Sequence, residues 1–163
     1  MSNKKPELAP IGEHKHQLPS LDEMRHESGL DQVTEEQVDK AIAKAYLSEL
    51  PTMVLEWIVA SHGSRSLLPV IIAGFLRLLR KRWIGESTSA LDDRKEKAAR
   101  KITWGSFGKS GKEPMKVARL CDLETDHIEN ILILCVAPMD CRIVLLYILR
   151  RRYQEESLKN LLK

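Results

Sequence analysis

The stretch from Met53 to Ile84, MVLEWIVASHGSRSLLPVIIAGFLRLLRKRWI, holds most of the uninterrupted apolar sequence of the chain. The polar break SHGSRS divides it, and Gly63 within this break can adopt the left-handed conformation that ends a helix. We therefore predict two helices folded back on each other, the first over about 52–61 and the second from about Leu67 to Arg82. The second is apolar on nearly all sides before its basic end, which is typical of a buried helix.

The segment before this centre has clear helix signals. Thr34 and Gln37 have the spacing of a capping box, in which a hydroxyl and an amide satisfy free backbone donors reciprocally. Apolar residues then recur at spacings of three and four, which predicts a helix over about 35–50. Further upstream we expect a short helix at 21–30, preceded by a flexible arm over 1–20 that contains three prolines.

The segment after this centre predicts three more helices and one hairpin. Ser89 can cap an exposed helix that ends near Lys101, and alternation around a glycine-rich turn indicates a hairpin over Ile102–Val117. Thr125 or Asp126 can cap the next helix, and a long helix follows over about 140–162. The expected fold is mainly α: one compact domain over 21–163, with about five helices and one small β-hairpin.

Composition places the chain among globular proteins, with 43% hydrophobic and 30% charged residues. Three cysteines are an odd number at no recognisable spacing, and the first ten residues have no secretory pattern. These features favour reduced thiols and a cytoplasmic location.

The charge is distributed unevenly along the chain. Residues 64–119 hold 14 Lys and Arg against 5 Asp and Glu, whereas residues 1–63 hold 6 against 11. A basic middle of this kind predicts either an anionic partner or neutralisation by the acidic first third. The residues that we expect to contact nucleic acid or an acidic protein surface are Arg77, Arg80, Lys81, Arg82, Arg100, Lys101, Lys109 and Lys112.

A membrane-associated protein that uses the apolar helix over 67–83 is the main alternative. A spanning helix needs about 20 apolar residues, and neither half of the apolar centre reaches that length before a charge or the polar break. We therefore expect the helices to be buried within the protein rather than in a membrane.

Enzymatic chemistry is not indicated by the motifs. The Gly108-Lys109-Ser110 run lacks the upstream glycine of a phosphate loop, because position 103 is Thr103. The zinc-capable set Cys121, His127, Cys135 and Cys141 lacks the paired short spacing of structural zinc sites. We therefore predict no catalytic residues, no cofactor and no metal site, and no small-molecule substrate is evident.

One pattern in the last third of the chain carries a resemblance. Thr103 and Trp104 precede a turn with Gly111, and DLETDHIEN follows at 122–130. This order resembles a module of small uncharacterised phage and bacterial proteins, in which a T-W or W-T pair and a glycine turn lead to D-(M/L)-x-x-x-H-(L/I)-x-N and a helix with a basic end. Here that end is Arg150–Arg152, although the hairpin is longer than in the module. The residues of unknown role in it are Trp104, Asp122, His127 and Asn130.

The resemblance implies a phage or mobile-element origin and no particular activity. Together with the basic middle, it favours a small phage-type binding protein that is not an enzyme. We expect a regulator or inhibitor that acts on nucleic acid or on a host protein that handles nucleic acid. A structural or assembly role in a virion ranks after the membrane alternative, and the sequence leaves oligomerisation open.

Overall fold

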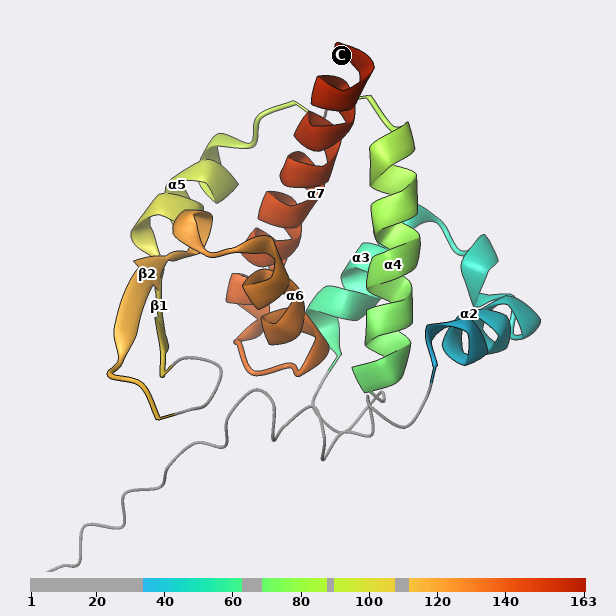
Figure 1. The fold of residues 1–163 in the computed structure, drawn as a ribbon, viewed down its shortest axis with the longest axis horizontal. Coiled ribbons are helices and arrows are strands. Elements are labelled where there is room, and N and C mark those ends of the chain that lie inside the picture. Colours follow the sequence, from blue (N-terminus) through green and yellow to red (C-terminus); the bar gives the residue numbers. More distant parts are fainter. Residues whose placement is uncertain (1–33, 63–68, 88–89, 108–111) are drawn as a thin grey trace, which may run out of the picture.

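The computed structural model describes residues 34–62, 69–87, 90–107 and 112–163 (Figure 1). Within these ranges the fold is mainly α, with six α-helices and one two-stranded antiparallel hairpin, which confirms the predicted fold class. In chain order the elements are α2 (Glu35–Lys44), η1 (Leu47–Glu49), α3 (Thr52–Ser61), α4 (Pro69–Gly85), α5 (Asp93–Lys101), β1 (Thr103–Ser106), β2 (Lys116–Arg119), η2 (Leu120–Asp122), α6 (Thr125–Ile133) and α7 (Met139–Leu161).

The last helix, α7, lies at the centre of the arrangement. It packs against α3, α4, α5, α6 and η2, with α4 alongside it, α5 and the hairpin on one side, and α2 on the far side of α4 (Figure 1). A helix surrounded in this way must be apolar around most of its circumference, and the first half of α7 is. Its buried apolar residues are Val144, Leu145, Leu146, Ile148, Leu149 and Tyr153.

The predicted apolar pair forms the core with α7. Helix α3 has the predicted bounds, and α4 follows it as a second helix; the break at residues 63–68 lies outside the described residues. The side chains that are 0% exposed in these two helices are Leu55, Val59, Ile72, Leu79 and Trp83.

The helix predicted over 35–50 is shorter in the structure. The capping box of Thr34 and Gln37 is present, but α2 ends at Lys44, because Tyr46 has a φ of 58° and a left-handed backbone cannot continue an α-helix. The chain resumes as the 3-10 turn η1. The apolar spacing predicted too long a helix because Leu47 and Leu50 still pack against the core after the helix has ended.

The predicted caps of α5 and α6 were wrong. Helix α5 is capped by Asp92, whose carboxylate accepts hydrogen bonds from the backbone of Arg94 and Lys95 at 3.1 Å each; Ser89 lies outside the described residues. Helix α6 begins after Glu124 without a side-chain cap. Thr125 and Asp126 are the first two residues inside the helix rather than its cap, and the Thr125 hydroxyl accepts a hydrogen bond from the guanidinium of Arg152 at 3.3 Å.

The hairpin predicted over Ile102–Val117 is present, although its second strand continues to Arg119. Trp104 pairs with Ala118, and both pack against the core, so this face of the hairpin is covered. None of the helices within the described residues has the length and apolar character that crossing a membrane requires.

Gly74 allows a close contact between α2 and α4. A Cβ at this position would meet the side chains of Ile42 and Val38, the latter at 2.8 Å. We predict that Gly74→Ala lowers the free energy of unfolding by about 1 kcal/mol, because overpacking costs about 1–3 kcal/mol and exceeds the about 1 kcal/mol that alanine gains in a helix. Urea denaturation followed by circular dichroism measures the change.

Gly85 in the same helix is the matched control. A Cβ there has nothing within 4 Å, so Gly85→Ala should be neutral or slightly stabilising. Equal effects of the two substitutions would contradict the close packing of α2 on α4.

Candidate nucleic-acid interface

One side of α5 is fixed to α7. Tyr147 of α7 accepts a hydrogen bond from the Asp92 backbone at 3.3 Å and donates one to the Glu96 carboxylate at 3.0 Å. The guanidinium of Arg151 lies 3.8 Å from the same carboxylate, and Ala99 of α5 is buried. Glu96 and Ala99 of α5 are therefore turned inward.

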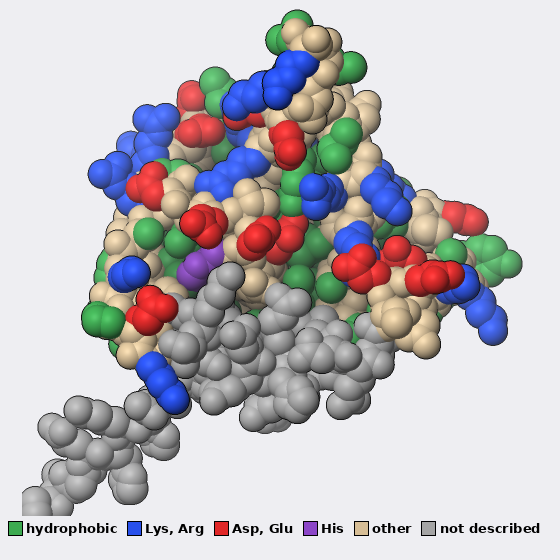
Figure 2. All heavy atoms as spheres, viewed as in Figure 1, with side chains coloured by type: hydrophobic (Ala, Val, Ile, Leu, Met, Phe, Trp, Pro, Cys, Tyr) green, Lys and Arg blue, Asp and Glu red, His purple; other side chains and the backbone are tan. Residues whose placement is uncertain are grey.

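The other side of α5 carries basic side chains. Arg94, Lys97 and Lys101 are exposed, and their spacing of three and four places them on one helical face. None of these three forms an ion pair with a carboxylate of the described residues. We call these three residues the α5 basic stripe. Figure 2 shows Lys and Arg side chains gathered at the upper left of the molecule, where Figure 1 has α5.

The surroundings of the stripe are also basic. Arg100 is largely exposed and makes a long ion pair of 3.7 Å with Glu96, which leaves most of its guanidinium in solvent. A depression of about 430 Å³ adjoins the helix and is lined by Leu91, Asp93, Glu96, Lys97, Arg100 and Lys101. Exposed carboxylates are few here, with Asp93 the one in this lining that is exposed.

Two of the basic residues predicted in α4 hold the fold together. Arg77 forms an ion pair of 2.9 Å with Asp39 of α2. Arg82 donates hydrogen bonds of 2.6 Å to the carbonyl oxygens of Ser48 and Leu50, which fixes the chain between η1 and α3. Both guanidinium groups already have internal partners, so a phosphate would have to compete with those partners for them.

The other predicted residues differ in their surroundings. Arg80 lies over the ring of Tyr153, 4.7 Å from its centroid, and Lys81 beside it is exposed. Lys112 is exposed and has an interaction of its own, whereas Lys109 lies outside the described residues. The structure thus brings Arg100 and Lys101 together on α5 and separates them from Arg77 and Arg82 on α4.

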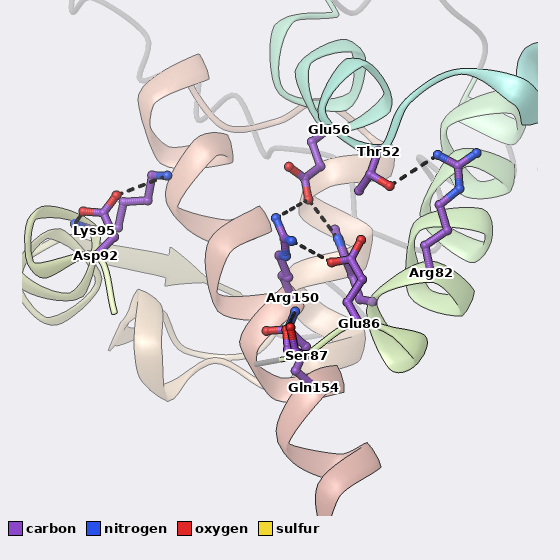
Figure 3. Close-up of polar contacts among 10 residues, drawn as sticks. Thr52, Glu56, Arg82, Glu86, Ser87, Asp92, Lys95, Arg150 and Gln154 are labelled. Carbon is purple, nitrogen blue, oxygen red and sulfur yellow. Dashed lines mark hydrogen bonds and ion pairs between the residues drawn. The ribbon is translucent and has the colours of Figure 1, made fainter. Parts of the chain in front are cut away.

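The three consecutive arginines predicted at the basic end of the last helix lie in the middle of α7 and contact three different neighbours. Arg150 bridges the carboxylates of Glu56 and Glu86, at 3.2 and 2.6 Å (Figure 3). Arg151 contacts Glu96 of α5, and Arg152 donates to the carbonyl oxygen of Cys121 in η2 at 2.9 Å. Because successive residues of a helix point about 100° apart, consecutive arginines reach separate elements.

The four residues of unknown role lie on three elements. Trp104 is half-buried on β1, Asp122 is exposed in η2, and His127 and Asn130 are half-buried on α6. Burial lowers the pKa of His127. Asp122 lies near Arg119, 3.8 Å away, and no hydrogen bond or ion pair within the described residues joins Trp104, Asp122 and His127 to one another.

A buried polar cluster lies where α3 ends near the start of α7. His62 and Arg142 are each only 6% exposed. The guanidinium of Arg142 donates to the carbonyl oxygen of His62 and lies 3.0 Å from Sγ of Cys135. The ring of His62 donates through Nδ1 to the carbonyl oxygen of Val59 at 2.7 Å. Burial, together with the nearby charge of Arg142, lowers the pKa of His62.

Neither this cluster nor any other in the described part of the chain groups three His, Cys, Asp or Glu side chains in a way that could hold a metal ion. Comparisons with known proteins give no match: no family model, no curated protein and no solved structure is similar to this chain.

Sequence reasoning missed Arg94 and Lys97, the first two residues of the stripe. The signal was present, since a helical projection of 93–101 places Arg94, Lys97 and Lys101 on one side and Glu96 and Ala99 on the other. The segment was predicted as an exposed helix, and only its last two basic residues, Arg100 and Lys101, were named as contacts.

Arg82→Ala should lower the free energy of unfolding by about 2 kcal/mol, because it removes two charge-assisted hydrogen bonds to the half-buried backbone of Ser48 and Leu50. Chemical denaturation of the variant measures the change. The control is Lys81→Ala, which changes the exposed residue immediately before Arg82 in the same helix. Its free energy of unfolding should stay within about 0.5 kcal/mol of the wild type. A larger loss of stability from Lys81→Ala than from Arg82→Ala would contradict the structural role of Arg82.

Stability should fall as the pH drops below about 6.5. The pKa of His62 is lowered in the folded protein, so as the pH falls the unfolded chain binds a proton at this residue before the folded chain does. The contribution of neutral His62 to the free energy of unfolding is therefore complete above the ordinary histidine pKa of about 6.5 and is lost as the pH falls below it. His127 adds to the effect in the same direction. Melting temperatures across about pH 5.5–7.5 test this, and His62→Gln should flatten the profile. An unchanged slope in that variant would show that His62 is not the titrating group.

Proposed function

We propose that the protein is a small binding protein without enzymatic activity that contacts the phosphate backbone of nucleic acid through the α5 basic stripe. The observation that carries the proposal is the division of the cations. Arg77, Arg82 and Arg150 bind groups within the fold, whereas Arg94, Lys97 and Lys101 face solvent on one side of a helix.

The chemistry of the stripe suits a backbone contact. Three cations over two helical turns follow a polyanion, and releasing its counterions favours binding at low salt. The stripe holds a single guanidinium, Arg94, of the kind that reads guanine edges, and it has no amide or aromatic side chain, so we expect little sequence preference. Its anchor is rigid, because Tyr147 and Arg151 hold the inner face of α5 on α7.

The wider role is also a proposal. The resemblance of the last third to phage and bacterial modules, together with the basic surface, supports a phage-type regulator or inhibitor in the cytoplasm of the host. It would act on nucleic acid directly or on a host protein bound to nucleic acid. Trp104, Asp122, His127 and Asn130 have no assigned part in this binding.

The test reverses the stripe in one variant, Arg94→Glu, Lys97→Glu and Lys101→Glu. Binding to a fluorescently labelled DNA duplex and to an RNA strand is followed by anisotropy between about 50 and 200 mM salt. We expect the triple variant to lose most of its affinity and the logarithmic salt slope to fall by about 2–3, since each lost phosphate contact removes about 0.9 on a duplex.

The matched control is Lys44→Glu, Lys159→Glu and Lys163→Glu, which changes three exposed lysines on α2 and at the end of α7 and shifts the net charge equally. Equal losses in both variants would show that overall charge, rather than the stripe, governs binding. No binding by the wild type at the lowest salt would make nucleic acid the wrong ligand and leave an acidic protein surface as the partner.

A further inference from the structure

Arg142 is a buried cation for which the described residues provide no carboxylate. It lies in the first turn of α7 and is 6% exposed, and no acidic side chain of the described ranges forms an ion pair with it. Its guanidinium donates to the carbonyl oxygen of His62 and, at 3.0 Å, to the sulfur of Cys135. A buried cation is costly unless an anion neutralises it. Of the two groups that accept from Arg142, the thiol is the one that can ionise to supply a negative charge.

The backbone at Cys135 fixes the sulfur in this position. Helix α6 ends in a Schellman turn, in which the N–H groups of Cys135 and of the next residue donate to the carbonyl oxygens of Leu132 and Ile131 at 3.3 and 3.4 Å. Cys135 has a φ of 52°, a left-handed conformation that glycine adopts at lower cost. Its thiol donates to the carbonyl oxygen of His62 at 3.1 Å. The turn and this hydrogen bond together hold the sulfur beside the guanidinium.

Two buried polar atoms of the same cluster have no hydrogen-bond partner. The ring of His62 donates through Nδ1, so Nε2 carries a lone pair, and this atom is buried without a donor. Nε of Arg142 is a buried donor without an acceptor. A hydroperoxide offers groups of both kinds, because its O–H donates and its oxygens accept. Cys135 is only partly buried, which leaves the sulfur within reach of so small a molecule.

The other two cysteines have less reactive surroundings. Burial raises the pKa of the Cys121 thiol, and the neighbouring Asp122 adds to the rise. Burial also raises the pKa of the Cys141 thiol, together with the charge of Asp140. Neither sulfur accepts a hydrogen bond from an arginine side chain within the described residues. Since the thiolate is the nucleophilic form, these two thiols are the internal standards for the reactivity of Cys135.

We propose that Cys135 is a redox-active thiol that small hydroperoxides oxidise to a sulfenic acid, with Arg142 as the cation that stabilises the reacting thiolate. The sulfur attacks one peroxide oxygen, so an S–O bond forms as the O–O bond breaks. The sulfur loses two electrons to the peroxide, and the departing oxygen takes up the proton that the thiol released and leaves as water or an alcohol. The chain is modified once without turnover, and the modification does not depend on nucleic-acid binding.

The experiment treats the full chain with hydrogen peroxide in the presence of dimedone, which traps sulfenic acids. Peptide mass spectrometry then measures the rate of labelling at each of the three cysteines. Cys135 should be labelled at least about tenfold faster than Cys121 or Cys141 in the folded protein. In concentrated urea the three rates should converge, because unfolding separates Cys135 from Arg142. Equal rates in the folded protein, or a preference that persists in urea, would overturn the proposal.

Substitutions of Arg142 test the role of its charge. Arg142→Gln should slow the labelling of Cys135 at least about fivefold, and Arg142→Lys, which keeps a cation, should restore most of the rate. A merely structural role of Arg142 predicts the opposite, since a loosened cluster would expose the thiol and speed its labelling. The matched control is Arg119→Gln, which removes the same charge from an exposed arginine and should leave Cys135 unchanged.

Circular dichroism melting verifies that each variant is folded. An unchanged or faster rate at Cys135 in folded Arg142→Gln would overturn the proposal, as would an equal slowing in Arg119→Gln. If Arg142→Gln does not fold, the comparison of the three cysteines in the folded wild type and in urea decides.

Discussion

The interaction on which the fold depends is the pairing of Arg150 with Glu56 and Glu86. The guanidinium joins α7 to α3 and to the end of α4, and the indole of Trp83 donates to the same Glu56 carboxylate from within the core. The groups are only partly buried, so each ion pair contributes less than a fully buried one. Removal of the arginine would nevertheless leave two neighbouring carboxylates without their shared counterion beside a buried tryptophan. The position is therefore constrained in charge and in shape.

The same constraint explains which cations remain at the surface. Arginine has a planar guanidinium with several donors, which suits it to bridging two groups at once, whereas lysine is a strongly hydrated point charge. Three of the described arginines that link elements, Arg77, Arg82 and Arg150, each reach at least one group far away in sequence. The lysines stay mainly in solvent. A basic segment of sequence consequently contains both cations that bind groups within the fold and cations that face solvent. Only those that face solvent are available to bind a partner.

Much of the fold followed from periodicity and capping. The capping box at Thr34, the bounds of α3 and the long last helix were predicted because each depends on neighbours within a few residues. The early end of α2 at Tyr46 was not, since its left-handed backbone has no local signal in tyrosine. The roles of Arg82 and Arg150 were out of reach for another reason. Their partners lie 34 and 94 residues away at the farthest, and the sequence shows a basic cluster without showing what it touches.

The central position of α7 also has a consequence for synthesis. A ribosome adds about 5–20 residues per second, so the 94 residues between Glu56 and Arg150 separate the two partners by roughly 5–20 s. During that interval α3 and α4 have emerged with one apolar side uncovered, because the helix that covers it comes last among the described elements. The nascent chain is thus exposed to chaperones and proteases until α7 leaves the ribosome. The time for which this apolar surface stays uncovered is therefore set by the rate of translation from α4 to the end of α7.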